Sequence, residues 1–469
     1  MKTSIKPILT LFFLIIFFNP ELSFSQIVKF AAIGDYGKAG PAELAVSNLV
    51  KSWNPDFIIT LGDNNYALGE QSTIDSNIGQ YYHGFIRPYI GNFEPSDTGL
   101  NRFFPSIGNH DWYTGGAPYL AYFTLSGNER YYDFVKGNIH FFVVNSDHTE
   151  LHGRGRNSIQ ALWLKDQLSR SSEKWNIIYF HHVPYSSSDV HKSDTALQWP
   201  FKSWGASTVL TGHNHHYERL IVDNLTYFVN GLGGYPLIYP FNDTVLAGSQ
   251  KRYNNTYGAM LITSYNDSLI LKFYSLGDTL IDNFKILPAI KLLSLTVNIQ
   301  GFYNSTTNTL TGDTVIAYLR NYNSPYSIID SSKSYVDFLG RGNFSFTKAA
   351  NATKYYLVIK HRNSIETWSD SLKFTANVSN YNFTLSLAQA YGNNMIQIDS
   401  TPVRFAIYNG DVNQDGIVDL ADLFLIDNDA YNFATGYFPT DLTGDNFVGV
   451  DDMAIAENNA YNFVSTVKP

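Results

Sequence analysis

The chain has 469 residues, of which 44% are hydrophobic and 16% aromatic, and this composition excludes a largely disordered protein. It has no cysteine, so any metal ion must be held by His, carboxylate, amide or phenolate groups. The formal net charge is −9 and no stretch is rich in Lys or Arg, so nucleic-acid binding is not expected.

The first 25 residues have the features of a secretory signal peptide. Two lysines precede an apolar run at 8–18, and the small residues of 23–25 suit a signal peptidase. The run is short for a helix that must cross a hydrocarbon core about 30 Å thick, although a membrane anchor stays the alternative. We expect a mature chain that begins at Gln26, has no membrane span, and is secreted or held at the cell surface.

From residue 26 to 288, apolar runs alternate with segments of helical periodicity, such as 41–53 and 158–169. This alternation predicts an α/β layered domain. The six apolar runs are 27–33, 57–61, 103–107, 139–145, 176–180 and 207–211.

Five of these runs end in side chains that can bind metal ions. A single Asp or His after a strand is ordinarily a cap or a turn residue. Five in order predict one metal centre, because ligand sites in α/β sheets lie at the carboxyl ends of the strands. A glycine precedes four of the segments, and we expect it to permit a sharp turn. The segments are Gly34-Asp35-Tyr36-Gly37, Gly62-Asp63-Asn64-Asn65-Tyr66, Gly108-Asn109-His110-Asp111, His181-His182 and Gly212-His213-Asn214-His215.

Together these segments resemble the motifs of the calcineurin-like metallophosphoesterases, and more narrowly those of the purple acid phosphatases. The resemblance covers roughly residues 27–285 and implies a four-layer α/β/β/α sandwich. It also implies a hydrolase of phosphate monoesters, in which a hydroxide held by two metal ions attacks phosphorus. A phosphodiesterase on the same site, or a non-catalytic surface or scaffold protein, stays the alternative.

Gly37 stands where most members of that superfamily carry a metal-binding His, and Tyr66 can replace it with a phenolate. This exchange is what the purple branch implies, and a phenolate suits ferric iron. The expected ions are Fe³⁺ with Fe²⁺, Zn²⁺ or Mn²⁺. The resemblance assigns Asp35, Asp63, Tyr66 and His215 to the first ion and Asp63, Asn109, His182 and His213 to the second, with Asp63 as the bridge.

The resemblance also suggests which histidines act on the substrate. His182 is preferred to His181 as the metal ligand because His182-Val183-Pro184 fits the family's His-x-Pro spacing, and His181 stays the alternative. His110 is the first candidate to protonate the leaving group, and His191 matches a second family histidine near the substrate. Asp111 is expected to orient His110.

Beyond residue 288 the pattern changes. Residues 289–405 contain short strand patterns, such as 313–319 and 354–360, separated by Gly, Asn and Ser. They predict an all-β sandwich of immunoglobulin-like size. No catalytic cluster is visible in this segment, so we expect a spacer or adhesion module.

The segment 406–469 repeats itself with a period of 30 residues. Residues 405–467 hold eleven of the 41 acidic residues and no Lys or Arg, which leaves 30 acidic against 32 basic residues elsewhere. Both copies have the oxygen-ligand spacing of an EF-hand loop, which predicts calcium binding. The expected ligands are Asp411, Asn413, Asp415, the Ile417 carbonyl, Asp419 and Asp422 in the first copy, and Asp441, Thr443, Asp445, the Phe447 carbonyl and Asp452 in the second.

The two copies resemble a type I dockerin. The resemblance implies a small helical domain that binds two Ca²⁺ and docks to a cohesin-like partner protein. A calcium-stabilised cap without a partner stays the alternative. Asn446 stands where the first copy has Gly416, and Asn tolerates the left-handed backbone expected there. Without calcium, repulsion among the carboxylates should loosen this segment.

Overall fold

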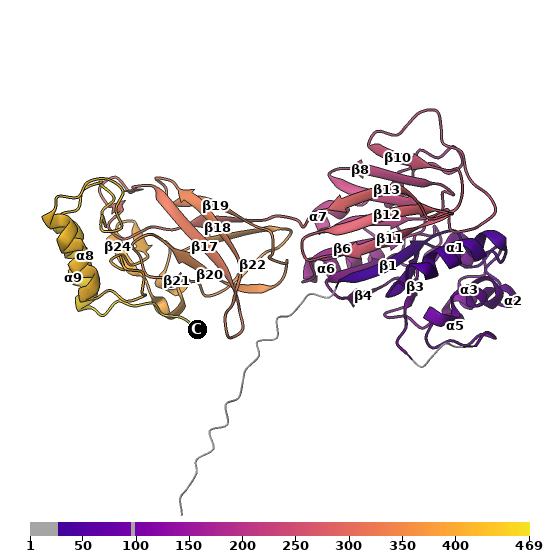
Figure 1. The fold of residues 1–469 in the computed structure, drawn as a ribbon, viewed down its shortest axis with the longest axis horizontal. Helices are drawn as coiled ribbons and strands as arrows, with labels where there is room; N and C mark the ends of the chain where they lie inside the picture. The colour runs from indigo at the N-terminus through magenta and orange to yellow at the C-terminus, as the bar shows by residue number, and fades with distance from the viewer. Residues whose placement is uncertain (1–26, 95–98) are drawn as a thin grey trace, which may run out of the picture.

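The computed structural model describes residues 27–94 and 99–469, and the expected signal peptide lies outside them. Figure 1 shows an elongated molecule with a two-sheet domain at one end, two helices at the other, and a β-rich segment between them. In the parts of the chain that the structure describes, no helix is both long and apolar enough to cross a membrane.

The first sheet of the two-sheet domain has six strands. In spatial order they are β13 (Thr279–Ile286), β12 (Leu269–Ser275), β11 (Gly258–Ser264), β1 (Val28–Ile33), β2 (Phe57–Thr60) and β3 (Phe103–Pro105). The strands β1, β2 and β3 are parallel, whereas β11 pairs antiparallel with β1. This mixed sheet therefore has three parallel carboxyl ends at one edge.

The second sheet has seven strands. In spatial order they are β10 (Ser249–Tyr253), β8 (Tyr217–Val222), β9 (Leu225–Asn230), β7 (Thr208–Thr211), β6 (Trp175–Phe180), β5 (Ile139–Val143) and β4 (Tyr132–Lys136). The strands β5, β6 and β7 are parallel, and all six residues of β6 are buried. Burial on both faces explains why β6 reads as a continuous apolar run.

Alternation of side chains across the sheets builds a four-layer sandwich. In β1, Phe30 and Ala32 pack between the two sheets, whereas Ala31 and Ile33 pack against the helical side. The first sheet is covered by α1 (Pro41–Ser52), α2 (Gln71–Ile74), α3 (Gln80–Tyr82) and α5 (Ala117–Tyr122), and the second by α6 (Ile159–Arg170) and α7 (Phe201–Trp204). This mixed α/β fold agrees with the α/β/β/α order that the sequence predicts.

The β-rich segment contains two larger sheets with a common hydrophobic core. One sheet has β19 (Arg341–Phe346), β14 (Lys291–Thr296) and β23 (Val378–Asn382), and the other has β18 (Ile328–Val336), β17 (Asp313–Asn321), β20 (Lys354–Lys360), β21 (Thr367–Trp368) and β22 (Leu372–Lys373). Two short hairpins complete it, β15 (Tyr303–Asn304) with β16 (Thr309–Leu310) and β24 (Ile396–Ser400) with β25 (Val403–Ala406). Leu295 of β14 and Leu357 of β20 both lie in that core, so the two sheets face each other.

The C-terminal repeats form two loops, each followed by a helix. We call residues 411–422 the first loop and residues 441–452 the second loop. The helices α8 (Leu420–Tyr431) and α9 (Val450–Tyr461) share a small core that includes Ile426 and Ala456. Gly416 has a φ of +94° and Asn446 a φ of +68°, so both loops make the left-handed turn that the spacing predicts.

Candidate metal centre

The five candidate strand ends meet at one edge of the two-sheet domain. Because β1, β2 and β3 are parallel in one sheet and β6 and β7 in the other, their carboxyl ends lie on the same side. The loops that follow bring ligand atoms of Asp35, Asp63 and His181 within 4.8 Å of one another. All three residues are buried, so this edge holds a compact group of metal-binding side chains.

Tyr66 lies at the centre of the first half of this group. Its hydroxyl donates to Asp63 Oδ2 at 2.9 Å and to Asp35 Oδ1 at 3.2 Å. The same hydroxyl is 3.3 Å from His215 Nε2, which is itself 3.2 Å from Asp35 Oδ1. The four side chains predicted for one ion therefore converge on one point.

The second half of the group surrounds His181. Its Nε2 lies 3.3 Å from Asp63 Oδ2 and 3.0 Å from Asn109 Oδ1, at the start of α4 (Asn109–Trp112). His213 Nδ1 is 3.1 Å from the same nitrogen. Asp63 thus belongs to both halves, as a bridging carboxylate would.

The two histidines that follow β6 occupy different places in this group. His181 faces the carboxylates, whereas His182 Nδ1 lies 2.9 Å from Ser146 Oγ on the neighbouring strand end. The ring of His182 also lies near the group, with its centroid 4.5 Å from that of His213. His181, the alternative that the sequence left open, is therefore the histidine of this pair that groups with Asp35 and Asp63, and the choice of ligand stays a prediction.

Three of the candidate ligands have a left-handed backbone. The φ angles of Asp35, Asp63 and His213 are +55°, +53° and +67°. Such conformations cost about 1–3 kcal/mol for non-glycine residues and cluster at functional sites. A Cβ on Gly34 or Gly212 would lie 2.5 Å from a backbone oxygen. These two glycines therefore allow close packing of the chain, and the ligands themselves make the turn.

The electrostatics of the group favour cation binding. Burial alone would lower the pKa of His181, but the carboxylates of Asp63 and Asp35 outweigh it and raise that pKa to about 9. Burial and the same carboxylates raise the pKa of Tyr66 well above its ordinary value. Burial and the neighbouring histidines lower the pKa of His213. Tyr66 can ionise only beside a compensating cation, and His181 must release a proton to bind one.

Backbone carbonyls orient two of the imidazoles. His181 Nδ1 lies 2.8 Å from Leu61 O, and His215 Nδ1 lies 2.8 Å from Leu237 O. Each ring therefore presents Nε2 to the carboxylates, as metal-binding histidines do when their other nitrogen is anchored. Sequence reasoning missed these anchors because a backbone carbonyl leaves no trace in residue identity.

The two candidate catalytic histidines lie at the rim of the group. His110 Nε2 is 3.9 Å from Asp63 Oδ2, and its Nδ1 is 2.5 Å from Ala67 O. The ring of His191 stacks on that of His213, with centroids 4.2 Å apart. Both rings therefore border the group of candidate ligands.

Asp111 does not orient His110, contrary to the expectation from the motif. Its carboxylate accepts hydrogen bonds from the N–H of Gly108 at 2.9 Å and from Asn64 Nδ2 at 2.7 Å. Asn64 Oδ1 in turn accepts from the Tyr36 hydroxyl at 2.9 Å. Asp111 and Asn64 therefore join the loop after β2 to the loop after β3. The sequence did not predict this role of Asn64. Its position next to Asp63 was the feature that could have indicated it.

The donor set fits two metal ions. It offers carboxylate, phenol, amide and imidazole groups, which suit iron, zinc and manganese. Within residues 27–94 and 99–469, neither Asp35 nor Asp63 forms an ion pair with Lys or Arg. Their ion-pair partners are the histidines His110, His181 and His215, which are themselves metal-ligand types, so bound cations could replace the protons of these rings.

Comparisons with known proteins match part of this chain to a family model. Residues 28–217 match the model of the calcineurin-like phosphoesterases. This part of the chain is therefore a calcineurin-like phosphoesterase domain.

The homologues of this domain include purple acid phosphatases. Purple acid phosphatase 15 of Arabidopsis thaliana is 27% identical over 220 residues, which cover 41% of this chain and 40% of the relative. Human tartrate-resistant acid phosphatase type 5 is 22% identical over 247 residues, or 44% of this chain and 73% of the relative. The structure of purple acid phosphatase PPD1 from yellow lupin (Lupinus luteus) has a TM-score of 0.47 at 19% identity, and covers 56% of this chain and 54% of that one.

A second candidate site lies in the C-terminal repeats. In the first loop, Asp422 Oδ1 accepts from the N–H of Val412 at 2.9 Å, and in the second Asp452 Oδ1 accepts from that of Leu442 at 2.7 Å. Asp411 Oδ1 is buried and has no hydrogen-bond partner. Burial and nearby Asp422 raise the pKa of Asp411 to about 6. The unpartnered oxygen and the crowded carboxylates fit a calcium ligand set.

Proposed function

We propose that this protein is a secreted, binuclear metal-dependent phosphatase of the purple acid type that hydrolyses phosphate monoesters. The observation that supports it most is the position of the Tyr66 hydroxyl, within 3.3 Å of Asp35, Asp63 and His215. A tyrosine among these ligands, together with Gly37 in place of the usual histidine, is the feature that separates the purple branch from the wider superfamily.

We assign one ion to Asp35, Asp63, Tyr66 and His215, and the other to Asp63, Asn109, His181 and His213. When bound, such a pair of ions holds phosphate oxygens and lowers the pKa of a water molecule, which supplies the nucleophile. The protein positions the ester at the edge where β1, β2, β3, β6 and β7 end. Burial of Asp35 and Asp63 keeps bulk water from competing for the ions.

His110 is the proposed proton donor to the leaving oxygen. Its Nδ1 can donate to Ala67 O, which leaves Nε2 facing Asp63 and the ester. When both ring nitrogens carry protons, Nε2 can donate to the departing alkoxide. His191, stacked on His213, is placed to form a hydrogen bond with a phosphate oxygen.

We expect Tyr66→Phe to abolish a visible charge-transfer band that the iron-loaded wild type should show. The phenolate is the donor of that band, and phenylalanine keeps the ring while removing the oxygen. The measurement is a visible spectrum with metal analysis of both proteins. Tyr235→Phe is the matched control, because the Tyr235 ring stacks on Tyr66 with centroids 3.9 Å apart. A fully metallated wild type without the band would leave only the broader superfamily assignment.

Two rival functions share this site. A phosphodiesterase would turn over bis-nitrophenyl phosphate faster than nitrophenyl phosphate, and the comparison of the two rates decides between them. A non-catalytic surface protein would bind metal and hydrolyse neither ester. We favour hydrolysis of monoesters because the homologues of this chain include acid phosphatases.

We further propose that residues 1–25 direct export and that the C-terminal repeats bind two Ca²⁺ and dock to a cohesin-like protein. Contiguous exposed apolar patches, unlike single apolar residues, mark interaction surfaces. Corresponding residues of both repeats are exposed: Tyr431 by 81%, Phe433 by 76%, Tyr461 by 84% and Phe463 by 87%.

Removal of calcium is expected to lower the melting temperature of the repeats. At a calcium concentration 100 times the dissociation constant, binding contributes about 2.7 kcal/mol for each site. Differential scanning calorimetry with calcium or with EGTA measures this change. The variant Asp63→Asn is the control, because it alters the metal centre and should keep the calcium-dependent transition. Identical scans in calcium and EGTA would contradict the calcium proposal.

A further inference from the structure

The two loops of the repeats differ in the charge at their ligand positions, although each loop holds four aspartates in all. At the ligand positions, the first loop has four aspartates where the second has three. Thr443 and Gly449 stand in the second loop where the first has Asn413 and Asp419. Because calcium affinity rises with the number of charged ligands, the second loop starts with the weaker set.

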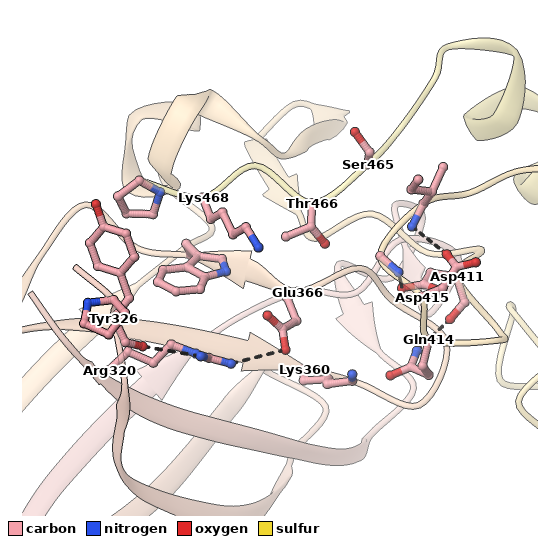
Figure 2. Close-up of a pocket in the computed structure, with 15 residues that line it drawn as sticks. Arg320, Tyr326, Lys360, Glu366, Asp411, Gln414, Asp415, Ser465, Thr466 and Lys468 are labelled. Carbon is pink, nitrogen blue, oxygen red and sulfur yellow. Dashed lines mark hydrogen bonds and ion pairs between the residues drawn. The ribbon is translucent and has the colours of Figure 1, made fainter. Parts of the chain in front are cut away.

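The first loop has a looser counter-charge, because Lys360 lines the same pocket and acts on Asp411 without forming an ion pair with it. Figure 2 shows Asp411 and Asp415 at one end of a pocket of about 570 Å³ between the β-rich segment and this loop. Arg320 of the same pocket pairs with Glu366 at 3.7 Å, away from the loop. In the described part of the chain, no Lys or Arg forms an ion pair with either aspartate. The buried Asp411 Oδ1 therefore stays without a partner.

The second loop has a guanidinium beside its first ligand. Arg362, which follows β20, places Nη2 3.6 Å from Asp441 Oδ2. The Asp441 side chain is 1% exposed and that of Arg362 is 12% exposed, so water screens the pair poorly. This charge comes from the β-rich segment and not from the repeats.

Several contacts hold Arg362 in that position. Its Nε donates to Asp313 Oδ2 at 3.0 Å, and its guanidinium lies over the ring of Tyr437, 4.2 Å from the centroid. The Tyr437 hydroxyl donates to Asp313 Oδ1 at 2.8 Å, and His361 Nε2 lies 2.9 Å from Asp313 Oδ2. The guanidinium is therefore packed in place, and a cation entering the second loop must bind beside it.

Neighbouring contacts also hold the backbone of the second loop. Asn363 Nδ2 donates to Asp441 O at 2.8 Å, and Asn409 Nδ2 donates to Leu442 O at 3.0 Å. Asn363 of the β-rich segment and Asn409, which follows β25, thus hold the start of this loop by hydrogen bonds that involve no cation. The second loop consequently depends less on calcium for its shape than a free EF-hand loop does.

We propose that Arg362 is an internal counter-ion of the second loop, so that calcium fills the first loop before the second and binds it more tightly. This inference rests on the proposed calcium binding. A fixed positive charge near a divalent ion opposes its binding. The guanidinium of Arg362 and the smaller number of charged ligands therefore both weaken calcium binding at the second loop. We expect dissociation constants that differ by about tenfold or more, with the second loop as the weaker site.

The test is calcium titration by isothermal calorimetry on the full chain after treatment with EGTA. Wild type should show two unequal sites, Asp411→Asn should lose the tighter one, and Asp441→Asn the weaker one. Arg362→Met should tighten the weaker site by about tenfold, because it removes the opposing charge. The tighter site should not change. Arg362→Lys is the matched control and should leave both constants near their wild-type values.

Arg362→Gln is the second variant, because it removes the charge and keeps a hydrogen-bond donor if Arg362→Met fails to fold. Equal affinities in wild type, or a weaker site that is unchanged or further weakened in Arg362→Met and Arg362→Gln, would overturn the inference. Absence of calcium binding at both loops would overturn the calcium proposal as well. Hydrolysis of nitrophenyl phosphate depends on neither result, so the phosphatase proposal is judged separately.

Discussion

Asp63→Asn is expected to lower kcat/KM for a phosphate monoester on the order of 10³-fold, which corresponds to about 4 kcal/mol of transition-state stabilisation. The Asp63 carboxylate is shared by both halves of the metal centre, with Tyr66 at 2.9 Å and His181 at 3.3 Å. Asparagine keeps the shape but removes the negative charge that would join two cations. Initial rates on nitrophenyl phosphate, with metal content determined on the same sample, measure the effect.

The control for this variant is Asp166→Asn. Asp166 forms an exposed ion pair with Arg170 on α6, and such pairs contribute little. We expect its rate to equal that of the wild type. Circular dichroism should show that Asp63→Asn stays folded. A folded Asp63→Asn protein with two bound metal ions and a wild-type rate would disprove the bridging role.

His181→Ala and His182→Ala are expected to differ strongly. His181→Ala should lose one of the two metal ions and about 10³-fold in kcat, because its Nε2 lies among Asp63, Asn109 and His213. His182→Ala should keep both ions and lose activity by about tenfold, as expected of a residue that acts through its neighbours. Metal analysis by atomic emission and steady-state kinetics give the two readouts.

Each of these variants serves as the control for the other, because the two histidines are adjacent and both follow β6. Loss of metal from His182→Ala together with retention in His181→Ala would show that His182 is the ligand, as the His-x-Pro spacing of the family implies. Loss in both would mean that the end of β6 requires both side chains to keep its shape. The rescue of His181→Ala by added imidazole would further support direct coordination.

The main strands could be predicted because they are buried and continuous. The apolar run 27–33 contains β1, and 176–180 lies within β6. The helical pattern 158–169 corresponds to α6, whose N-cap Ser158 accepts a hydrogen bond from the N–H of Ala161. Apolar periodicity and caps are local signals, so a single sequence carries them.

The details of the site could not be predicted in the same way. The choice between His181 and His182 depends on the direction in which β6 ends, and that direction is set by packing between two sheets. The link from Asp111 to Asn64 joins two loops 47 positions apart. The approach of Arg362 to Asp441 joins two parts of the fold that no sequence periodicity connects. Contacts of this kind appear only once the tertiary structure is known.

The elongated arrangement in Figure 1 has a consequence for how the enzyme would work on a surface. The helices α8 and α9 lie at the end of the molecule away from the two-sheet domain. If a partner bound those helices, the two-sheet domain would lie at the far end of the molecule from the attachment point. Substrates could then reach it while the tether is engaged, and attachment would localise hydrolysis without slowing it.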